Sequence, residues 1–256
     1  MKTEAVIFDW AGTTVDYGCF APVSAFVETF ASRGIDVTLD EVREPMGALK
    51  RDHIKQMLEM PRINEQFTDV HGRAFTEDDL DSMEAVFIKK LMAQLENHTT
   101  LKPYLLETTA LLRKNGIKIG TTTGYTSDML EPVAKSAKIQ GYEPDATFTP
   151  SDTGGIGRPA PNMIDANLKK LGITNKKAVI KIGDTVSDIK EGLNAGVMSV
   201  GIIEGSSIMG LSEAEYKGLT EEQKRLEIKR VQKVYQETGA DAVILNLSEV
   251  PTLLNI

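Results

Sequence analysis

Short apolar segments with strand character alternate with amphipathic segments along most of this chain. The strand-like runs are Ala5–Phe8, Ile117–Thr122, Ala178–Ile182, Met198–Ile203 and Ala242–Leu245. Segments with helical spacing follow several of them, namely Tyr104–Asn115, Asp128–Ile139, Asn162–Leu171 and Ser187–Ala195. Such alternation is typical of a parallel sheet covered by helices on both faces. We therefore predict an α/β fold with a Rossmann-like parallel sheet core.

Residues 17–98 interrupt this alternation. They have no convincing strand pattern, but they hold amphipathic helical stretches at Val23–Arg33, Glu44–Glu59 and Asp78–Leu95. We predict that residues 17–98 form an inserted all-helical cap domain, which leaves the core after the first strand. The core domain would then comprise residues 1–16 and 99–256.

Charge and composition limit the partners of this chain. Its 29 Lys and Arg against 37 Asp and Glu give a formal net charge of −8, which argues against nucleic acid or an anionic membrane as the main partner. No apolar run reaches the length of a membrane span, and Asp9 comes too early for a signal peptide. The single cysteine, Cys19, excludes an internal disulfide framework. We expect a cytoplasmic protein.

Two helix-start patterns lie near the C-terminus. Ser212–Glu215 and Thr220–Gln223 both have the spacing of a capping box. They begin a charged stretch that ends at Gly239, before the last predicted strand. This stretch is more typical of a solvated surface helix than of a dimer contact.

Three aspartates lie where two predicted strands end. Asp9 follows Ala5–Phe8, and Asp184 follows another apolar strand, with Asp188 four residues further at the start of a helix. Carboxylates gathered in this way suit Mg²⁺, which binds through one or two carboxylates together with water and phosphate oxygens. Taken alone, Asp9 could be a turn former and Asp188 only a helix-start residue.

Two further segments have the chemistry of a phosphate site. In Gly120–Tyr125, threonine hydroxyls and free N–H groups follow a strand, which is a suitable cradle for phosphate. In Gly157–Pro161, a proline-rich turn presents Arg158, which can hold a phosphoryl group bidentately. Each signal is weak by itself, because threonine-rich turns are common and an isolated arginine is more often a surface residue.

In this order, the four segments resemble the haloacid dehalogenase superfamily. The resemblance covers residues 1–16 and 99–256, the whole predicted core. It implies an aspartyl-phosphate intermediate on Asp9. It also implies that the side chains of Asp9 and Asp184 and the carbonyl of Ala11 bind Mg²⁺, with Asp188 supporting the site.

The resemblance also implies how the phosphoryl group is held. Thr123, or the adjacent Thr122, and Arg158 would bind it. The chain departs from the common pattern twice. Ala11 stands where a general acid is usual, and Arg158 stands where a lysine is usual.

A lysine in the insert has an unusual position. If Met46–Glu59 is one helix, a single apolar arc holds Met46, Leu49, Lys50, His53, Ile54 and Met57. Lys50 is the only charged member, and either it extends to solvent or it stays in apolar surroundings. In the second case its pKa falls and its amine can form a Schiff base. His53, one turn away, could move protons in that reaction, or it could be a packing histidine.

Lys50 offers an explanation for Ala11. An oxygen leaving group needs a proton, whereas a carbon leaving group needs an electron sink, and an imine on Lys50 would be one. The chain resembles the phosphonoacetaldehyde hydrolase (phosphonatase) family in Phe8–Asp16, in Met46-Gly47 with Lys50 and His53, in Thr122–Tyr125 and in Gly183–Asp188. The resemblance implies hydrolysis of the C–P bond of phosphonoacetaldehyde to acetaldehyde and phosphate.

The same resemblance suggests a homodimer that meets through the caps. Gly124 and Tyr125 would lie at the substrate. Met46 and Cys19 are further candidates for lining the pocket, although Met46 could simply pack in the core and Cys19 could be an incidental buried thiol.

Two alternatives stay open. The first is a phosphate-ester phosphatase or sugar phosphomutase of the same superfamily, against which Ala11 argues. The second is a non-catalytic module that binds phosphate or Mg²⁺ and signals through cap closure. The presence of Asp9, Asp184 and Lys50 together argues against the second.

Overall fold

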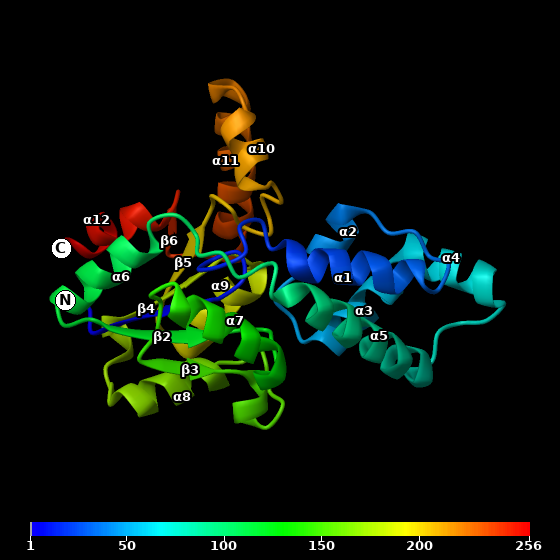
Figure 1. Ribbon diagram of the computed structural model, residues 1–256, viewed down its shortest axis with the longest axis horizontal. Helices are drawn as coiled ribbons and strands as arrows, with labels where there is room; N and C mark the ends of the chain where they lie inside the picture. Colours follow the sequence, from blue (N-terminus) through cyan, green and yellow to red (C-terminus); the bar gives the residue numbers. More distant parts are fainter. Residues whose placement is uncertain (1) are drawn as a thin grey trace.

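The computed structural model describes residues 2–256, with a six-stranded parallel sheet inside the larger of two groups of elements (Figure 1). The strands are β1 (Ala5–Phe8), β2 (Lys118–Thr122), β3 (Ala146–Phe148), β4 (Val179–Gly183), β5 (Met198–Ile202) and β6 (Ala242–Ile244). Their order is β3-β2-β1-β4-β5-β6, so β1 and β4 are central neighbours. Five strands agree with the predicted runs to within one residue at each end. The three-residue β3 has no recognisable period and was not predicted.

Both faces of the sheet are covered by helices, as expected for a parallel sheet. In β1, Val6 and Phe8 belong to the apolar core beneath α6 (Leu105–Lys114), α7 (Ser127–Ile139) and α12 (Val250–Leu254). Ala5 and Ile7 point to the opposite face and pack with α8 (Asn162–Leu171). α9 (Val186–Ala195) covers β4 and β5 beside α8.

Five helices follow β1 before α6 and β2, with no strand among them. They are α1 (Phe20–Ala31), α2 (Leu39–Arg43), α3 (Lys50–Glu59), α4 (Pro61–His71) and α5 (Glu77–Leu95). Figure 1 shows them as a separate group beside the sheet, at the end opposite the two termini. This confirms the predicted fold class, a Rossmann-like core with an inserted all-helical cap. The domain limits at residues 17 and 98 stay a prediction.

The prediction of one helix over Glu44–Glu59 was wrong. α2 ends at Arg43, and the next helix, α3, begins only at Lys50. Gly47, with a φ of 91°, turns the chain between them. Met46 and Leu49 therefore lie in this turn and not on the helix that carries Lys50 and His53.

The C-terminal capping boxes are confirmed. Ser212 caps α10 (Glu213–Gly218) and Thr220 caps α11 (Glu221–Thr238), each with the predicted reciprocal side-chain partner. α11 ends at Gly239, and only Val231 and Tyr235 of this helix are buried. It is thus a largely solvated helix that projects from the core (Figure 1). Among residues 2–256, no helix has the length and apolar character to cross a membrane.

Candidate active site

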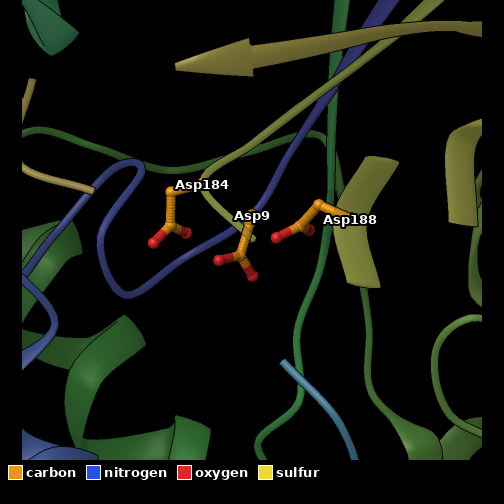
Figure 2. A group of neighbouring side chains, drawn as sticks. All are labelled: Asp9, Asp184 and Asp188. Atoms are coloured by element: carbon orange, nitrogen blue, oxygen red, sulfur yellow. The ribbon is translucent and has the colours of Figure 1, made fainter. Parts of the chain in front are cut away.

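Three aspartates converge at the carboxyl end of the sheet. Asp9 follows β1, Asp184 follows β4, and Asp188 lies in the first turn of α9. All three are buried, and each offers an oxygen within 4.8 Å of the others. Figure 2 shows Asp9 between the other two side chains. The close approach arises because β1 and β4 are parallel neighbours and end at the same edge.

Asp184 is held in a fixed orientation by the loops after β1 and β5. Thr13 Oγ1 donates to Asp184 Oδ1 at 3.0 Å, and the Ser207 amide donates to Oδ2 at 2.8 Å. Burial, together with the charges of Asp9 and Asp188, raises the pKa of Asp184 to about 8. Three buried carboxylates repel one another, so a divalent cation bound between Asp9 and Asp184 would relieve that repulsion. The donor set therefore fits Mg²⁺.

Asp188 has other partners. It forms the predicted helix start, since its Oδ2 accepts from the Thr185 hydroxyl at 2.6 Å. Its Oδ1 lies 2.8 Å from Lys181 Nζ and 3.0 Å from Arg158 Nη1. Burial alone would raise the pKa of Asp188, but Arg158 and Lys181 lower it below its ordinary value. Asp188 thus lies beside Asp9, held between the Thr185 hydroxyl and the two cations.

Arg158 is a buried residue of the site and not a surface arginine. Its guanidinium is ion-paired with Asp9 Oδ1, with Asp188, and with Glu191 Oε2 at 3.2 Å. Burial opposes its charge, yet these three carboxylates raise the pKa of Arg158. The structure therefore brings a permanent cation to the predicted nucleophile.

The two candidate threonines separate clearly. Thr123 lines the cavity described below, and its Oγ1 accepts a hydrogen bond from the Tyr125 amide at 3.1 Å. Thr122 turns to the opposite side, where its hydroxyl donates to Glu191 and accepts from Lys181 and Arg158. The position of Thr123 agrees with the expected phosphoryl contact.

Lys50, at the start of α3, is only 7% exposed. Its ammonium lies 5.4 Å from the ring centre of Tyr125, 5.7 Å from that of Phe26 and 5.9 Å from that of Phe87. Burial lowers the pKa of Lys50 to about 8. The amine is therefore partly unprotonated at neutral pH, as a Schiff-base lysine requires.

His53 is completely buried one turn after Lys50. Its ring stacks on Phe26 with 3.8 Å between ring centres, and its Nε2 lies 2.8 Å from the Val42 carbonyl. A carbonyl accepts only, so Nε2 carries the proton and Nδ1 is an acceptor, which has no hydrogen-bond partner among the described residues. Burial and the nearby charge of Lys50 lower the pKa of His53, which keeps the ring neutral.

Nine of the twelve predicted site residues meet around one small cavity. It encloses about 20 Å³ and is lined by Asp9, Ala11, Cys19, Pro22, Met46, Gly47, Lys50, Thr123, Gly124, Tyr125, Arg158 and Thr185. His53, Asp184 and Asp188 lie outside this lining. Because a single water needs about 10–15 Å³ of such space, the cavity is too small for a substrate. A substrate would need more space between these residues than the structure leaves.

Cap and core are in close contact around this cavity. A Cβ atom on Gly124 would lie 3.2 Å from the Gly47 carbonyl oxygen. One on Gly157, next to Arg158, would lie 2.7 Å from Leu49 Cδ2. Glycine at 124 and 157 therefore allows the turn before α3 to reach the core. Cys19 is buried as well, and burial raises the pKa of its thiol.

Sequence analysis missed three charged residues at the site. Lys181 and Glu191 are completely buried beneath Arg158, and Lys102 Nζ donates to the Gly12 carbonyl at 2.6 Å. Lys181 had a recognisable signal, because it is the only charged residue in an apolar strand. Glu191 follows Asp188 by three residues on one helix face, which is a weaker signal.

Comparisons with known proteins agree with this geometry. Residues 3–196 match the family model described as haloacid dehalogenase-like hydrolase. A phosphonoacetaldehyde hydrolase of Lysinibacillus sphaericus is 49% identical over all of this chain and 95% of its own. A bifunctional phosphonoacetaldehyde hydrolase/aminoethylphosphonate transaminase of Clostridioides difficile is 47% identical over 99% of this chain, which spans only 40% of that protein.

A solved structure has nearly the same fold. It is the crystal structure of a phosphonoacetaldehyde hydrolase-like protein from Oleispira antarctica, with a TM-score of 0.96 and 34% identity, covering 100% of this chain and 92% of that one. Structure and sequence thus agree over cap and core alike. The chain belongs to the haloacid dehalogenase-like hydrolases and, among them, to the phosphonoacetaldehyde hydrolase family.

Proposed function

We propose that this protein hydrolyses phosphonoacetaldehyde to acetaldehyde and phosphate. One observation carries the proposal. Lys50, with a pKa lowered to about 8, lines the same small cavity as Asp9, and Ala11 stands where an acid would be needed for an oxygen leaving group. The names of the relatives, phosphonoacetaldehyde hydrolase, support the same substrate.

Lys50 begins the reaction. Its unprotonated amine adds to the aldehyde carbon, and loss of water with uptake of one proton from solvent gives a protonated imine. The Asp9 carboxylate then attacks phosphorus, and the electron pair of the breaking C–P bond moves into the imine to form an enamine. Protonation of the enamine carbon and hydrolysis release acetaldehyde and restore the amine of Lys50.

Asp9 now carries the phosphoryl group as an acyl phosphate, and water cleaves it to phosphate. Arg158, paired with Asp9, stabilises negative charge on the phosphoryl oxygens throughout. Mg²⁺ held by Asp9, Asp184 and the Ala11 carbonyl would neutralise further charge at these oxygens. The closed cap excludes bulk water while the imine forms.

His53 is suited to proton transfer beside Lys50. Its buried ring is neutral, and Nδ1 is free to accept a proton. We propose that it removes a proton from the adding amine and returns it to the departing water. Pocket roles for Met46, Cys19, Gly124 and Tyr125 follow from their places in the cavity lining.

We also propose a cytoplasmic homodimer that meets through the caps. The helix α5 presents Ile88 and Met92, which are 37% and 38% exposed. Light scattering on the protein with Ile88→Glu, compared with the unchanged protein, tests this proposal. A dimer of equal strength in both would exclude the α5 face as the contact.

Borohydride reduction in the presence of phosphonoacetaldehyde tests the reaction. The expected result is a stable adduct on Lys50, detected by mass spectrometry. Lys50→Arg should lose both the adduct and phosphate release, whereas Asp9→Asn should keep the adduct and lose phosphate release. Absence of the adduct, or faster phosphate release from an alkyl phosphate, would overturn the proposal.

A further inference from the structure

A buried ion cluster lies directly beneath Asp9. It consists of two cations, Arg158 and Lys181, and two carboxylates, Asp188 and Glu191. Arg158 is 6% exposed and the other three are fully buried. The cluster is more than one ion pair, because each of the two carboxylates lies within ion-pair distance of both cations.

Lys181 stands at the centre of β4, a strand whose other members are Val179, Ile180, Ile182 and Gly183. Its Nζ donates to Thr122 Oγ1 at 2.7 Å and lies 2.8 Å from Asp188 Oδ1. Burying an ammonium costs free energy that an apolar residue would not, even when the charge is paired. Packing of the sheet alone therefore gives no reason for a lysine here.

The two cations share the same carboxylate oxygens. Asp188 Oδ1 lies 2.8 Å from Lys181 and 3.0 Å from Arg158. Glu191 Oε2 lies 3.2 Å from each of them. Lys181 thus neutralises charge that would otherwise be balanced by Arg158 alone.

This sharing matters for the orientation of Arg158. Its Nη2 group is ion-paired with Oδ1 of Asp9, the carboxylate expected to receive the phosphoryl group. Without Lys181, two unbalanced carboxylates would draw the guanidinium toward Asp188 and Glu191 and away from the phosphoryl oxygens. A cluster of two cations and two anions leaves Arg158 free to face the substrate.

We propose that Lys181 is a positioning residue, which neutralises Asp188 and Glu191 and so holds Arg158 toward the phosphoryl group. The proposal rests on the proposed function for the identity of the substrate. The predicted role of Lys181 in binding phosphate is the same whichever phosphoryl compound the protein acts on. Replacing Lys181 should affect phosphoryl transfer to Asp9 and leave imine formation at Lys50 unchanged, so the two steps can be measured separately.

The test uses Lys181→Met, Lys181→Met with Glu191→Gln, and the surface control Lys176→Met. Inorganic phosphate binding is measured by calorimetry with Mg²⁺ present. Lys181→Met should weaken binding and slow phosphate release by about 100-fold, the effect typical of removing one electrostatic contact to a transition state. The double variant restores the balance of charges, so its phosphate affinity and its rate of phosphate release should each be at least about 10-fold higher than those of Lys181→Met. Lys176→Met should match the unchanged protein.

Borohydride trapping distinguishes the possible outcomes. Trapping at Lys50 should be unchanged in Lys181→Met, whereas a general loss of structure would reduce trapping and phosphate binding together. Unchanged phosphate binding in Lys181→Met, or a double variant no better than the single one, would overturn the inference. If Lys181→Met does not fold, the double variant decides: phosphate binding within about 10-fold of the unchanged protein supports the role, and weaker binding refutes it. Absence of trapping in the unchanged protein would instead count against the proposed function.

Discussion

Gly47, in the cap turn before α3, lies directly against Thr185, the residue that caps α9 in the core. A Cβ atom at position 47 would lie 2.5 Å from Thr185 Oγ1 and 2.9 Å from Ser187 Cβ, well inside van der Waals contact. The backbone there also has a φ of 91°, which favours glycine. Cap and core meet at this point because Gly47 has no side chain.

Gly47→Ala should therefore prevent full closure of the cap. We expect phosphate release from phosphonoacetaldehyde to fall by about 100-fold, because a displacement of 1 Å at reacting groups has effects of this size. Trapping of the imine at Lys50 should slow as well, since Lys50 moves with the cap. Steady-state phosphate release and borohydride trapping measure the two effects.

Gly72→Ala is the matched control for this substitution. Gly72 has a φ of 67°, and a Cβ atom there would meet nothing within 4 Å. Both alanine variants bear the left-handed strain of about 1–2 kcal/mol, but only the one at position 47 has the clash. Equal loss of activity in both variants would contradict the closure argument.

Mg²⁺ should stabilise the folded protein, because the carboxylates of Asp9 and Asp184 converge only in the fold. At a concentration of about 100 times its Kd, a ligand adds about 2.7 kcal/mol to the free energy of unfolding, or roughly 5 °C or more in Tm. Removal of the ion with a chelator should reverse the shift. Asp184→Asn should abolish it and exposed Asp128→Asn should keep it, as differential scanning calorimetry can measure. The same shift in Asp184→Asn would exclude Asp184 as a ligand.

Most of the sheet was predictable because its strands are short, apolar and buried on both faces. Ala5–Phe8 is the clearest case, since no polar residue interrupts it and Asp9 ends it. The helix boundaries in the cap were less predictable. Apolar residues continue at helical spacing through Glu44–Leu49, but tertiary contacts between Gly47 and the core set the turn that periodicity could not show.

The site residues that directly follow a strand could be predicted from the sequence. Asp9 and Asp184 follow neighbouring parallel strands, so the topology brings them together. Lys50 was identified from an apolar helix face that included Met46 and Leu49, which lie outside α3. The apolar residues that follow Lys50 on α3 still place it on the buried face of that helix. Lys102 had no signal, because its acceptors are the carbonyls of Gly12 and Glu204, 90 and 102 positions away.

Lys50 should reduce the stability of the fold at neutral pH. Its pKa is about 8 in the folded protein and near 10.5 in the unfolded chain, so the unfolded chain binds the extra proton between these values. The free energy of unfolding should therefore rise with pH from about 8 to 10.5. Lys50→Met removes this penalty and should stabilise the protein at pH 7 by about 3 kcal/mol, an effect that fades by pH 10.5.

Urea denaturation at pH 7 and pH 10.5 measures this effect. Lys55→Met is the control, because Lys55 is a partly exposed lysine on the same helix. It gives the change in the free energy of unfolding when a lysine outside the cavity is replaced. A stabilisation by Lys50→Met that is the same at both pH values would show that packing, and not burial of the ammonium, is the cause.

We expect Ala11 to determine which leaving group the site can serve. Its side chain lines the cavity two residues after Asp9, where an acid could protonate a departing oxygen. Ala11→Asp should therefore raise the hydrolysis of an alkyl phosphate, such as glycerol 3-phosphate, by about 100-fold, the usual contribution of a positioned general acid. Release of phosphate from phosphonoacetaldehyde should fall, because the added carboxylate brings negative charge to a cavity that must bind a phosphonate.

Ala11→Asn separates the acid from the effect of size. Asparagine has nearly the shape of aspartate but cannot give up a proton to the leaving oxygen. We expect no gain in alkyl phosphate hydrolysis with asparagine, and a bell-shaped pH profile for the gain with aspartate. If both variants gained equally, the absence of an acid at position 11 would not be the reason for the expected preference for a carbon leaving group, and the chemical link between Ala11 and Lys50 would fail.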